Sequence, residues 1–135
     1  MINPAQQALT AYRNRVYSET LTLTGEEGVD DWTGYTARME VRHYGAQPGS
    51  ALISLATVMS GQGLVLTVGP NHVLTIAPRI EQATLAALPG GTSSDAVTGG
   101  DDAIFFHDLL LIAPDGDADA LRQGAFNLKP GVTIA

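Results

Sequence analysis

The sequence predicts an all-β domain made of two stacked antiparallel sheets. Short segments rich in Thr, Val, Leu and Ile follow one another closely, separated by Gly, Pro and Asn, which is typical of a β-sandwich or barrel. One segment, residues 35–44, alternates between apolar and polar side chains along its length. No unit of about 30 residues joins two strands through a helix, which disfavours a parallel, doubly wound sheet.

The first half of the chain begins with a polar segment and continues into two predicted strands. Residues 1–15 carry only scattered Ala and Leu and are expected to form an extended arm. Residues 16–24, VYSETLTLT, are rich in Thr and predict the first strand. In residues 35–44, YTARMEVRHY, the odd-numbered side chains are expected in the core and the even-numbered ones in solvent. Trp32, the single tryptophan, is expected to cap the core.

The second half adds further short strands and one helix. Residues 51–57, 64–69 and 73–78 predict three strands with turn residues between them. Residues 79–88 change to helical spacing and end at a Pro-Gly pair, so they predict a short helix. Residues 90–102 are rich in Gly, Ser, Thr and Asp and predict a long surface loop. With the last two strands, the count is about seven.

Those last two strands lie in residues 105–128 and flank an acidic corner. Asp115, Asp117 and Asp119 alternate there as at the start of a calcium-binding loop. That loop requires Gly at its sixth position and Glu at its twelfth, where this chain has alanine and phenylalanine. Pro114 and Gly116 fit a tight turn instead. We therefore predict a hairpin turn with solvent-facing acids and no metal.

The histidines give no sign of a metal or catalytic site. They lie on separate elements, and none belongs to a metal-binding spacing: His43, His72 and His107. By alternation His107 shares a face with Phe105 and other large apolar residues, so we expect a core histidine with one hydrogen bond, in preference to a ligand or base. Asp108 points to the opposite face and cannot form a dyad with it.

No other catalytic constellation is present in the sequence. The chain lacks the GxSxG pattern of a serine nucleophile, and the Gly- and Ser-rich stretch after the predicted helix lacks the lysine of a phosphate-binding loop. The absence of cysteine excludes disulfides and thiolate chemistry. We expect a protein that is not an enzyme and that uses no cofactor.

Composition narrows the range of partners. The 135-residue chain suits one domain, and its formal charge of -7 would repel nucleic acid. No apolar run is long enough to span a bilayer, and the N-terminus does not resemble a signal peptide, so no membrane contact is expected. Only 16% of the residues are charged. Much of the surface must therefore be uncharged and polar, or be covered by other protein.

The order of these segments resembles a family of small phage tail and baseplate proteins that includes the N-terminal immunoglobulin-like domain of baseplate upper proteins. The resemblance runs through ETLTLT (19–24), WTGYTARMEVR (32–42), LVL (64–66) and VLTIAPRIEQATLAALPGG (73–91). It ends with FHDLLL, a D-G hairpin and LRQGAFNL (106–128). The chain departs from the family pattern at His107, where an aromatic residue is usual, and in the longer loop 90–102.

This resemblance implies an immunoglobulin-like antiparallel β-sandwich of about seven strands over residues 16–135, with one short helix and an N-terminal arm over residues 1–15. It also implies a structural component of a phage virion, in the tail, baseplate or head–tail region. Such a protein is located in the virion, contacts other virion structural proteins and forms a homo-oligomer. The alternative is a ligand- or carbohydrate-binding β-sandwich module, including a host-receptor-binding part of the virion.

Two segments are candidates for these contacts. Ala8, Leu9 and Tyr12 are apolar or aromatic residues of the arm with no obvious core to join, so we expect the arm to lie on a neighbouring subunit. The alternative for the arm is a disordered tail. The second candidate is the loop 90–102, whose contact residues would be small and polar: Thr92, Ser93, Ser94 and Asp95.

Overall fold

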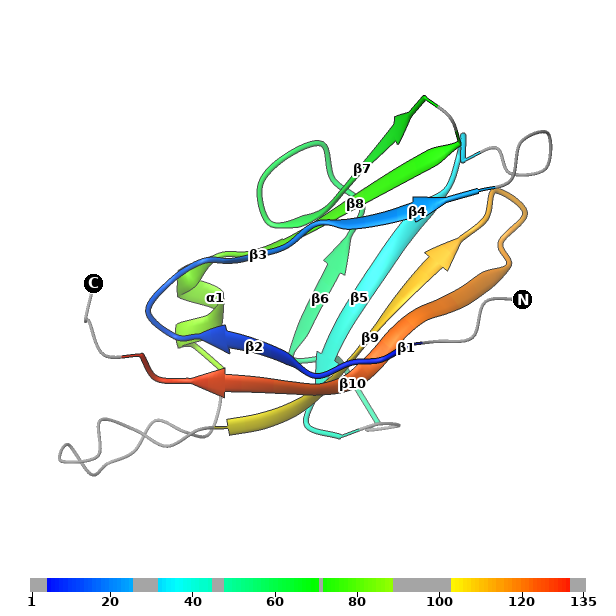
Figure 1. Ribbon diagram of the computed structural model, residues 1–135. Coiled ribbons are helices and arrows are strands. Elements are labelled where there is room, and N and C mark those ends of the chain that lie inside the picture. The colour runs from blue at the N-terminus through cyan, green and yellow to red at the C-terminus, as the bar shows by residue number, and fades with distance from the viewer. Residues whose placement is uncertain (1–4, 26–31, 45–47, 71, 89–102, 132–135) are drawn as a thin grey trace, which may run out of the picture.

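The computed structural model describes residues 5–25, 32–44, 48–70, 72–88 and 103–131, and it shows a mostly β domain with two facing sheets (Figure 1). The strands of the larger sheet are β1 (Ala5–Gln6), β2 (Leu9–Tyr12), β5 (Thr36–Arg42), β6 (Ile53–Ala56), β9 (Ala103–Ile112) and β10 (Ala118–Lys129). The smaller sheet and the helix contain β3 (Tyr17–Ser18), β4 (Leu21–Thr24), β7 (Gly63–Gly69), β8 (Val73–Ile80) and α1 (Gln82–Ala86). The predicted mostly β sandwich is confirmed.

The chain crosses between the sheets several times. The larger sheet has the order β1–β10–β9–β5–β6, and β2 pairs with β10 in the same register as β1. In the smaller sheet β8 is central, with β3 and β4 on one side and β7 on the other. The chain passes from the larger to the smaller sheet after β2, back after β4, to the smaller sheet again after β6, and to the larger sheet after β8.

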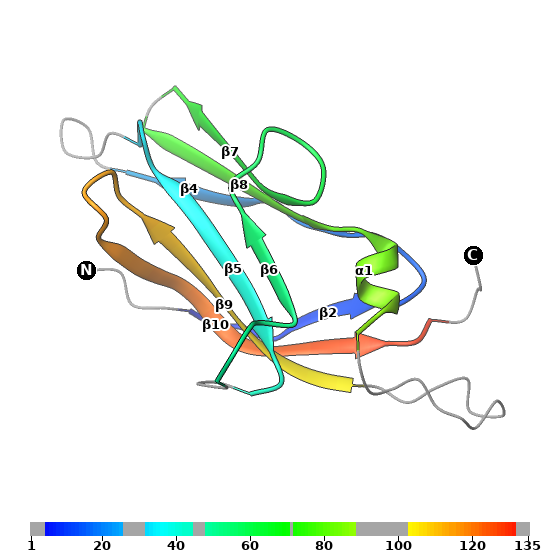
Figure 2. The ribbon, with the colours of Figure 1, turned by 180° about the vertical axis from the view of Figure 1, so that it is seen from behind.

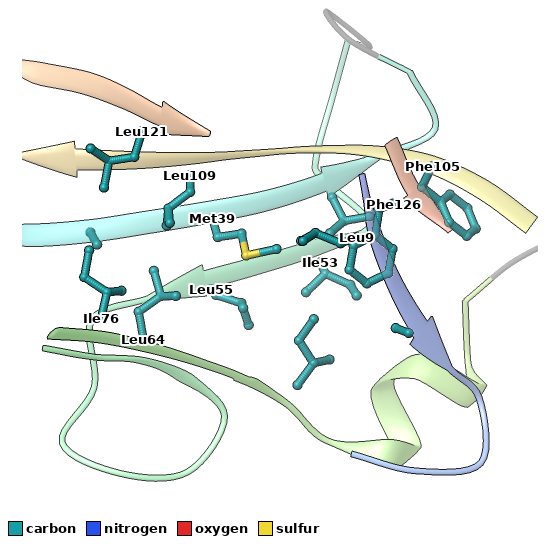
Figure 3. Packing of buried hydrophobic residues seen from close by; sticks show 14 of the residues in the cluster. Leu9, Met39, Ile53, Leu55, Leu64, Ile76, Phe105, Leu109, Leu121 and Phe126 are labelled. Atoms are coloured by element: carbon teal, nitrogen blue, oxygen red, sulfur yellow. The ribbon is translucent and has the colours of Figure 1, made fainter. Parts of the chain in front are cut away.

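The core lies between the two sheets and follows the predicted alternation. In β5, Ala37, Met39 and Val41 are buried, with none more than 1% exposed. Figure 3 shows side chains of the larger sheet, among them Met39, meeting Leu64 and Ile76 of the smaller sheet. Burial of this apolar area is the main favourable contribution to folding.

Trp32 closes the core as predicted. It is 8% exposed, its ring packs edge-on against Tyr35, and its indole N–H donates to the carbonyl oxygen of His72 at 2.9 Å. The hydrogen bond satisfies the only polar group of the side chain, so burial of the tryptophan leaves no N–H donor without a partner.

The helix is shorter than predicted. The expected span was residues 79–88, but Arg79 and Ile80 continue β8 and pair with Ser18 and Tyr17. Helix α1 therefore begins at Gln82. Leu85 faces the core and is fully buried, and the two ribbon views place α1 at the end of the sandwich beside the turn from β2 to β3 (Figures 1 and 2).

The N-terminal segment is not an arm separate from the described domain. Strands β1 and β2 both pair with β10, and they run parallel to it, so the larger sheet is not wholly antiparallel. Leu9 is 5% exposed and Ala11 2% exposed, both in the core. The expectation that Leu9 has no core to join was wrong, because β2 pairs with the edge of β10 that β9 leaves free.

Arg13 fixes the end of this N-terminal segment to α1. Its Nη1 atom donates to the carbonyl oxygens of Leu88 at 2.8 Å and Ala86 at 3.3 Å. In return, the side-chain amide of Gln82 donates to the carbonyl oxygen of Arg13 at 2.9 Å. A cation near the last carbonyls of a helix is favourable, because those groups have no partner inside the helix.

Strands β1 and β2 are separated at Gln7 and Ala8, where the chain passes close to Gly124 of β10. Gly124 has φ +152°, and a Cβ atom built there would lie 2.5 Å from the carbonyl oxygen of Gln7. Gln7 donates its N–H to the carbonyl oxygen of Gln123 at 2.9 Å. Only glycine allows the first strand to approach β10 this closely.

We predict that Gly124→Ala lowers the free energy of unfolding by more than about 1 kcal/mol, because both the backbone angle and the Gln7 carbonyl oppose a Cβ atom. Urea denaturation measures this change. The matched control is Gly116→Ala in the hairpin turn, where φ is +97° but no atom lies within 4 Å of the new Cβ. Equal costs at the two sites would contradict the proposed contact with the first strand.

Candidate interaction surface

The outer face of the larger sheet carries large apolar side chains. In β9 the odd-numbered residues from Phe105 onward are buried, and the even-numbered ones point outward. Ile104 is 63% exposed and Phe106 43% exposed. Tyr44 is 55% exposed and follows two residues after Arg42, which pairs with Phe106 in the register of β5 and β9. We call Tyr44, Ile104 and Phe106 the outer patch.

Two carboxylates lie side by side next to the outer patch. Glu40 of β5 stands directly opposite Asp108 of β9 in the antiparallel register. The pKa of Asp108 is raised, first by burial and second by the charge of Glu40, while Arg42 acts in the opposite direction. Like charges opposite one another destabilise a sheet, so this pair depends on neighbouring cations.

Two arginines supply those cations from the same strand. Arg42 contacts Glu40 at 3.0 Å between Nη2 and Oε1, and Arg38 contacts it at 3.4 Å between Nη2 and Oε2. Arg42 also donates to the carbonyl oxygen of Gly49 at 2.7 Å. The two cations and two anions beside the outer patch therefore have no formal net charge together, although the whole chain has a charge of -7.

A second polar group lies inside the sandwich. Arg122 of β10 is 1% exposed, and its Nη2 atom lies 2.6 Å from Oε1 of Glu19, between β3 and β4. A bulge in β10 between Ala120 and Arg122 lets both Leu121 and Arg122 face inward. The Nε and Nη1 atoms of Arg122 have no hydrogen-bond partner among the described residues. We call Tyr17, Glu19, His107 and Arg122 the inner polar cluster.

Aromatic rings fill the space around this cluster. Phe126 is fully buried, and the rings of Tyr17 and His107 pack edge-on against it at 6.0 and 6.4 Å between centroids. Burial raises the pKa of the Tyr17 hydroxyl, and the nearby carboxylate of Glu19 raises it further. Tyr17 therefore stays neutral.

His107 is buried on the core face of β9, as predicted, but without the expected hydrogen bond. It is 4% exposed, and neither ring nitrogen has a partner among the described residues. Burial and then the charge of Arg122 lower its pKa to about 4. Backbone groups of Gly124 and Ala125 lie near enough to oppose this shift, but they do not reach hydrogen-bond geometry. The neutral imidazole is part of the core.

The depressed pKa of His107 predicts a loss of stability in acid. The unfolded chain takes up a proton near pH 6.5, whereas the folded chain resists it until about pH 4. The contribution of neutral His107 to the free energy of unfolding is fully present above pH 6.5. It falls by up to about 3 kcal/mol as the pH drops toward 4. Urea denaturation across this range should show a steeper loss for the wild type than for His107→Phe. His43→Gln, an exposed position, is the control and should keep the wild-type slope.

The smaller sheet has a groove on its outer face. Its volume is about 450 Å³. Serine, threonine, glutamate and arginine side chains line it together with small and apolar residues: Ser18, Glu19, Thr20, Gly61, Val65, Ala77, Pro78 and Arg79. No aromatic side chain is among them. Glu19 connects this groove with the inner polar cluster, since its carboxylate also binds Arg122.

The acidic corner is a hairpin turn, as predicted. The N–H of Gly116 donates to the carbonyl oxygen of Ala113 at 2.9 Å, and the N–H of Asp117 donates to Oδ1 of Asp115 at 3.0 Å. Asp115, Asp117 and Asp119 are exposed. Across the described ranges no group of three or more His, Asp or Glu residues is arranged to hold a metal ion.

The predicted contact residues are not brought together by the described structure. Ala8 is exposed, Leu9 is in the core, and Tyr12 is half-buried with the Arg15 guanidinium 4.1 Å above its ring. Thr92, Ser93, Ser94 and Asp95 lie outside the described residues. The outer patch was not predicted from the sequence, although the adjacent pair Phe105 and Phe106 in an alternating strand signals that one aromatic ring must face outward.

Neither a protein-family model nor a curated protein sequence matches the chain. In the part of the chain that the structure describes, no helix is long and apolar enough to cross a membrane.

Proposed function

We propose that this protein is a structural component of a phage virion, in the tail, baseplate or head–tail region, and that it acts through contacts with neighbouring protein subunits. The observation that carries the proposal is the outer patch, where Tyr44, Ile104 and Phe106 expose large apolar surface at one end of the larger sheet. Grouped apolar residues of this kind mark interaction sites on soluble proteins. The resemblance of the sequence to small tail and baseplate proteins supplies the virion context.

The strand order supports the immunoglobulin-like form of this proposal. In the immunoglobulin sandwich, strands B, E and D are neighbours in one sheet, and C, F and G in the other, with C′ beside C in the variable type. Here β4–β8–β7 and β10–β9–β5–β6 have the same orders. The N-terminal strands depart from the constant-type arrangement, because β1 and β2 pair with the last strand and not with β4.

Purified particles test the proposal. We expect mass spectrometry of the particles to detect the protein in several copies, and labelled antibody to locate it by electron microscopy. Absence of the protein from intact particles would contradict a structural role. The particles should be washed at high salt as a control, because a contaminant held by charge alone would then be removed.

The groove on the smaller sheet favours a second candidate, a ligand- or carbohydrate-binding module. Its volume lies within the range of small-molecule sites, and Ser18, Thr20 and Arg79 offer hydrogen-bonding groups to a polar ligand. A glycan array is the direct measurement. Binding that is lost in Arg79→Ala and kept in Arg38→Ala, an exposed arginine on the other sheet, would support this candidate over the first.

A further inference from the structure

We propose that the outer face of the larger sheet is the contact between two copies of this chain, packed face to face about a two-fold axis. The proposal rests on the proposed function, because it names the partner of the same surface. The face is formed by β10, β9, β5 and β6, with the outer patch at one end and the charged residues of β5 and β9 beside it.

The apolar residues concentrate on this face. The described residues include five exposed large hydrophobics, and three of them form the outer patch. The other two, Met59 and Val68, lie in the loop before β7 and in β7 itself. Tyr, Phe and Arg are the residue types enriched at the centres of protein interfaces, and Tyr44, Phe106 and Arg42 bring all three together here.

The charges favour a second copy over a partner of opposite charge. The chain as a whole is acidic, so two copies repel each other through most of their surface. Beside the outer patch Arg38 and Arg42 balance Glu40 and Asp108, so the repulsion is weaker there. In a two-fold contact each residue of one copy meets residues from the same face of the other. A balanced face can therefore place its cations opposite the anions of the second copy, whereas a strongly basic partner would meet two arginines.

The shape of the face allows this contact. Two sheets can pack with their faces about 10 Å apart, which is close enough for the outer side chains of both to interdigitate. A stable pair needs roughly 800 Å² from each partner, more than the outer patch alone provides. The contact must extend along β9 over its half-buried outer residues Leu110 and Ile112 and over the charged residues between them and the patch.

Sedimentation equilibrium of the full chain tests the proposal. We expect the molar mass to double between about 1 and 300 µM. Phe106→Asp should weaken the association by at least about tenfold, since it places an acid within the apolar outer patch in both copies. Met59→Asp, at a residue that is 94% exposed and away from this face, is the matched control and should associate like the wild type. Circular dichroism should show that both variants remain folded.

A single introduced cysteine maps the contact independently, because the chain has no cysteine of its own. In Asn127→Cys the new thiol replaces a residue that pairs with Ile104 in the register of β9 and β10. In Thr67→Cys it replaces an exposed residue of the smaller sheet. We expect maleimide to react more slowly with the first thiol as protein concentration rises, and at a constant rate with the second.

A monomeric wild type throughout the concentration range would overturn the proposal, and so would equal association of the Phe106→Asp and wild-type chains. Protection of the thiol at position 67 and not at 127 would also overturn it. None of these results bears on whether the protein is present in particles. Conversely, a dimer of a protein that is absent from particles would refute the virion role alone.

Discussion

Replacing Glu19 by alanine is expected to lower the free energy of unfolding by about 3–5 kcal/mol, because it leaves the Arg122 guanidinium buried without its counter-ion. Arg122 is 1% exposed, and Nη2 has Glu19 as its partner at 2.6 Å, while Nε and Nη1 have none among the described residues. An arginine cannot escape this cost by losing its proton. Urea denaturation at neutral pH measures the change.

Replacing Arg122, the other partner of the pair, should lower the free energy of unfolding by less. In Arg122→Leu the remaining carboxylate of Glu19 is 22% exposed and can recover hydration. The double variant Glu19→Ala/Arg122→Leu should be more stable than Glu19→Ala, because an apolar pair of suitable volume can replace a buried ion pair. This asymmetry distinguishes a buried ion pair from a simple loss of packing.

A solvent-exposed ion pair provides the control. Arg79 and Glu81 lie 3.1 Å apart, with side chains 45% and 43% exposed. Glu81→Ala should change the stability by no more than about 1 kcal/mol. If Glu19→Ala cost no more than Glu81→Ala, Arg122 would have to be hydrated or paired in solution, and the burial described for the inner polar cluster would be wrong.

Replacing Phe105 by alanine is expected to cost about 3–5 kcal/mol, as is usual for the removal of a buried aromatic ring. Phe105 is 2% exposed and pairs with the fully buried Phe126 in the register of β9 and β10. The cost combines the lost transfer of apolar area from water with the cavity left behind. Thermal or urea denaturation monitored by circular dichroism measures it.

The neighbouring residue is a matched control of the same type. Phe106 is 43% exposed on the outer face, so Phe106→Ala in the monomer should change the stability by less than about 0.5 kcal/mol. The comparison must be made at low protein concentration, because self-association through the outer patch would add stability. Similar losses at both positions would mean that this part of β9 is covered on both faces.

The proposed role requires a surface that combines electrostatic repulsion with a site for contact. The chain's excess of acidic residues opposes aggregation, and the acids of the 113–117 turn face water. The outer patch is an exception, because four charges that balance one another lie beside its exposed apolar side chains. An assembly subunit needs such an exception, since a surface that is polar everywhere offers little favourable area to a partner.

Local periodicity in the sequence determined which segments are strands and which of their faces are buried. The alternation in residues 35–44 correctly placed Met39 in the core, and the same rule placed His107 beside Phe105. The tight turn at Gly116 was also readable, because the residue types that permit a turn act within a few positions of one another. These features depend only on neighbours in the chain.

Pairing between distant segments was decided by the tertiary structure. That β2 lies beside β10 depends on an edge left free more than a hundred residues later, so Leu9–Tyr12 could not be recognised as part of the sheet. Arg122 points inward because of a bulge in β10 that no local sequence pattern predicted. The outer patch exists because β5 pairs with β9. A side chain's periodicity fixes the face on which it lies, but only the neighbouring strand determines what it meets there.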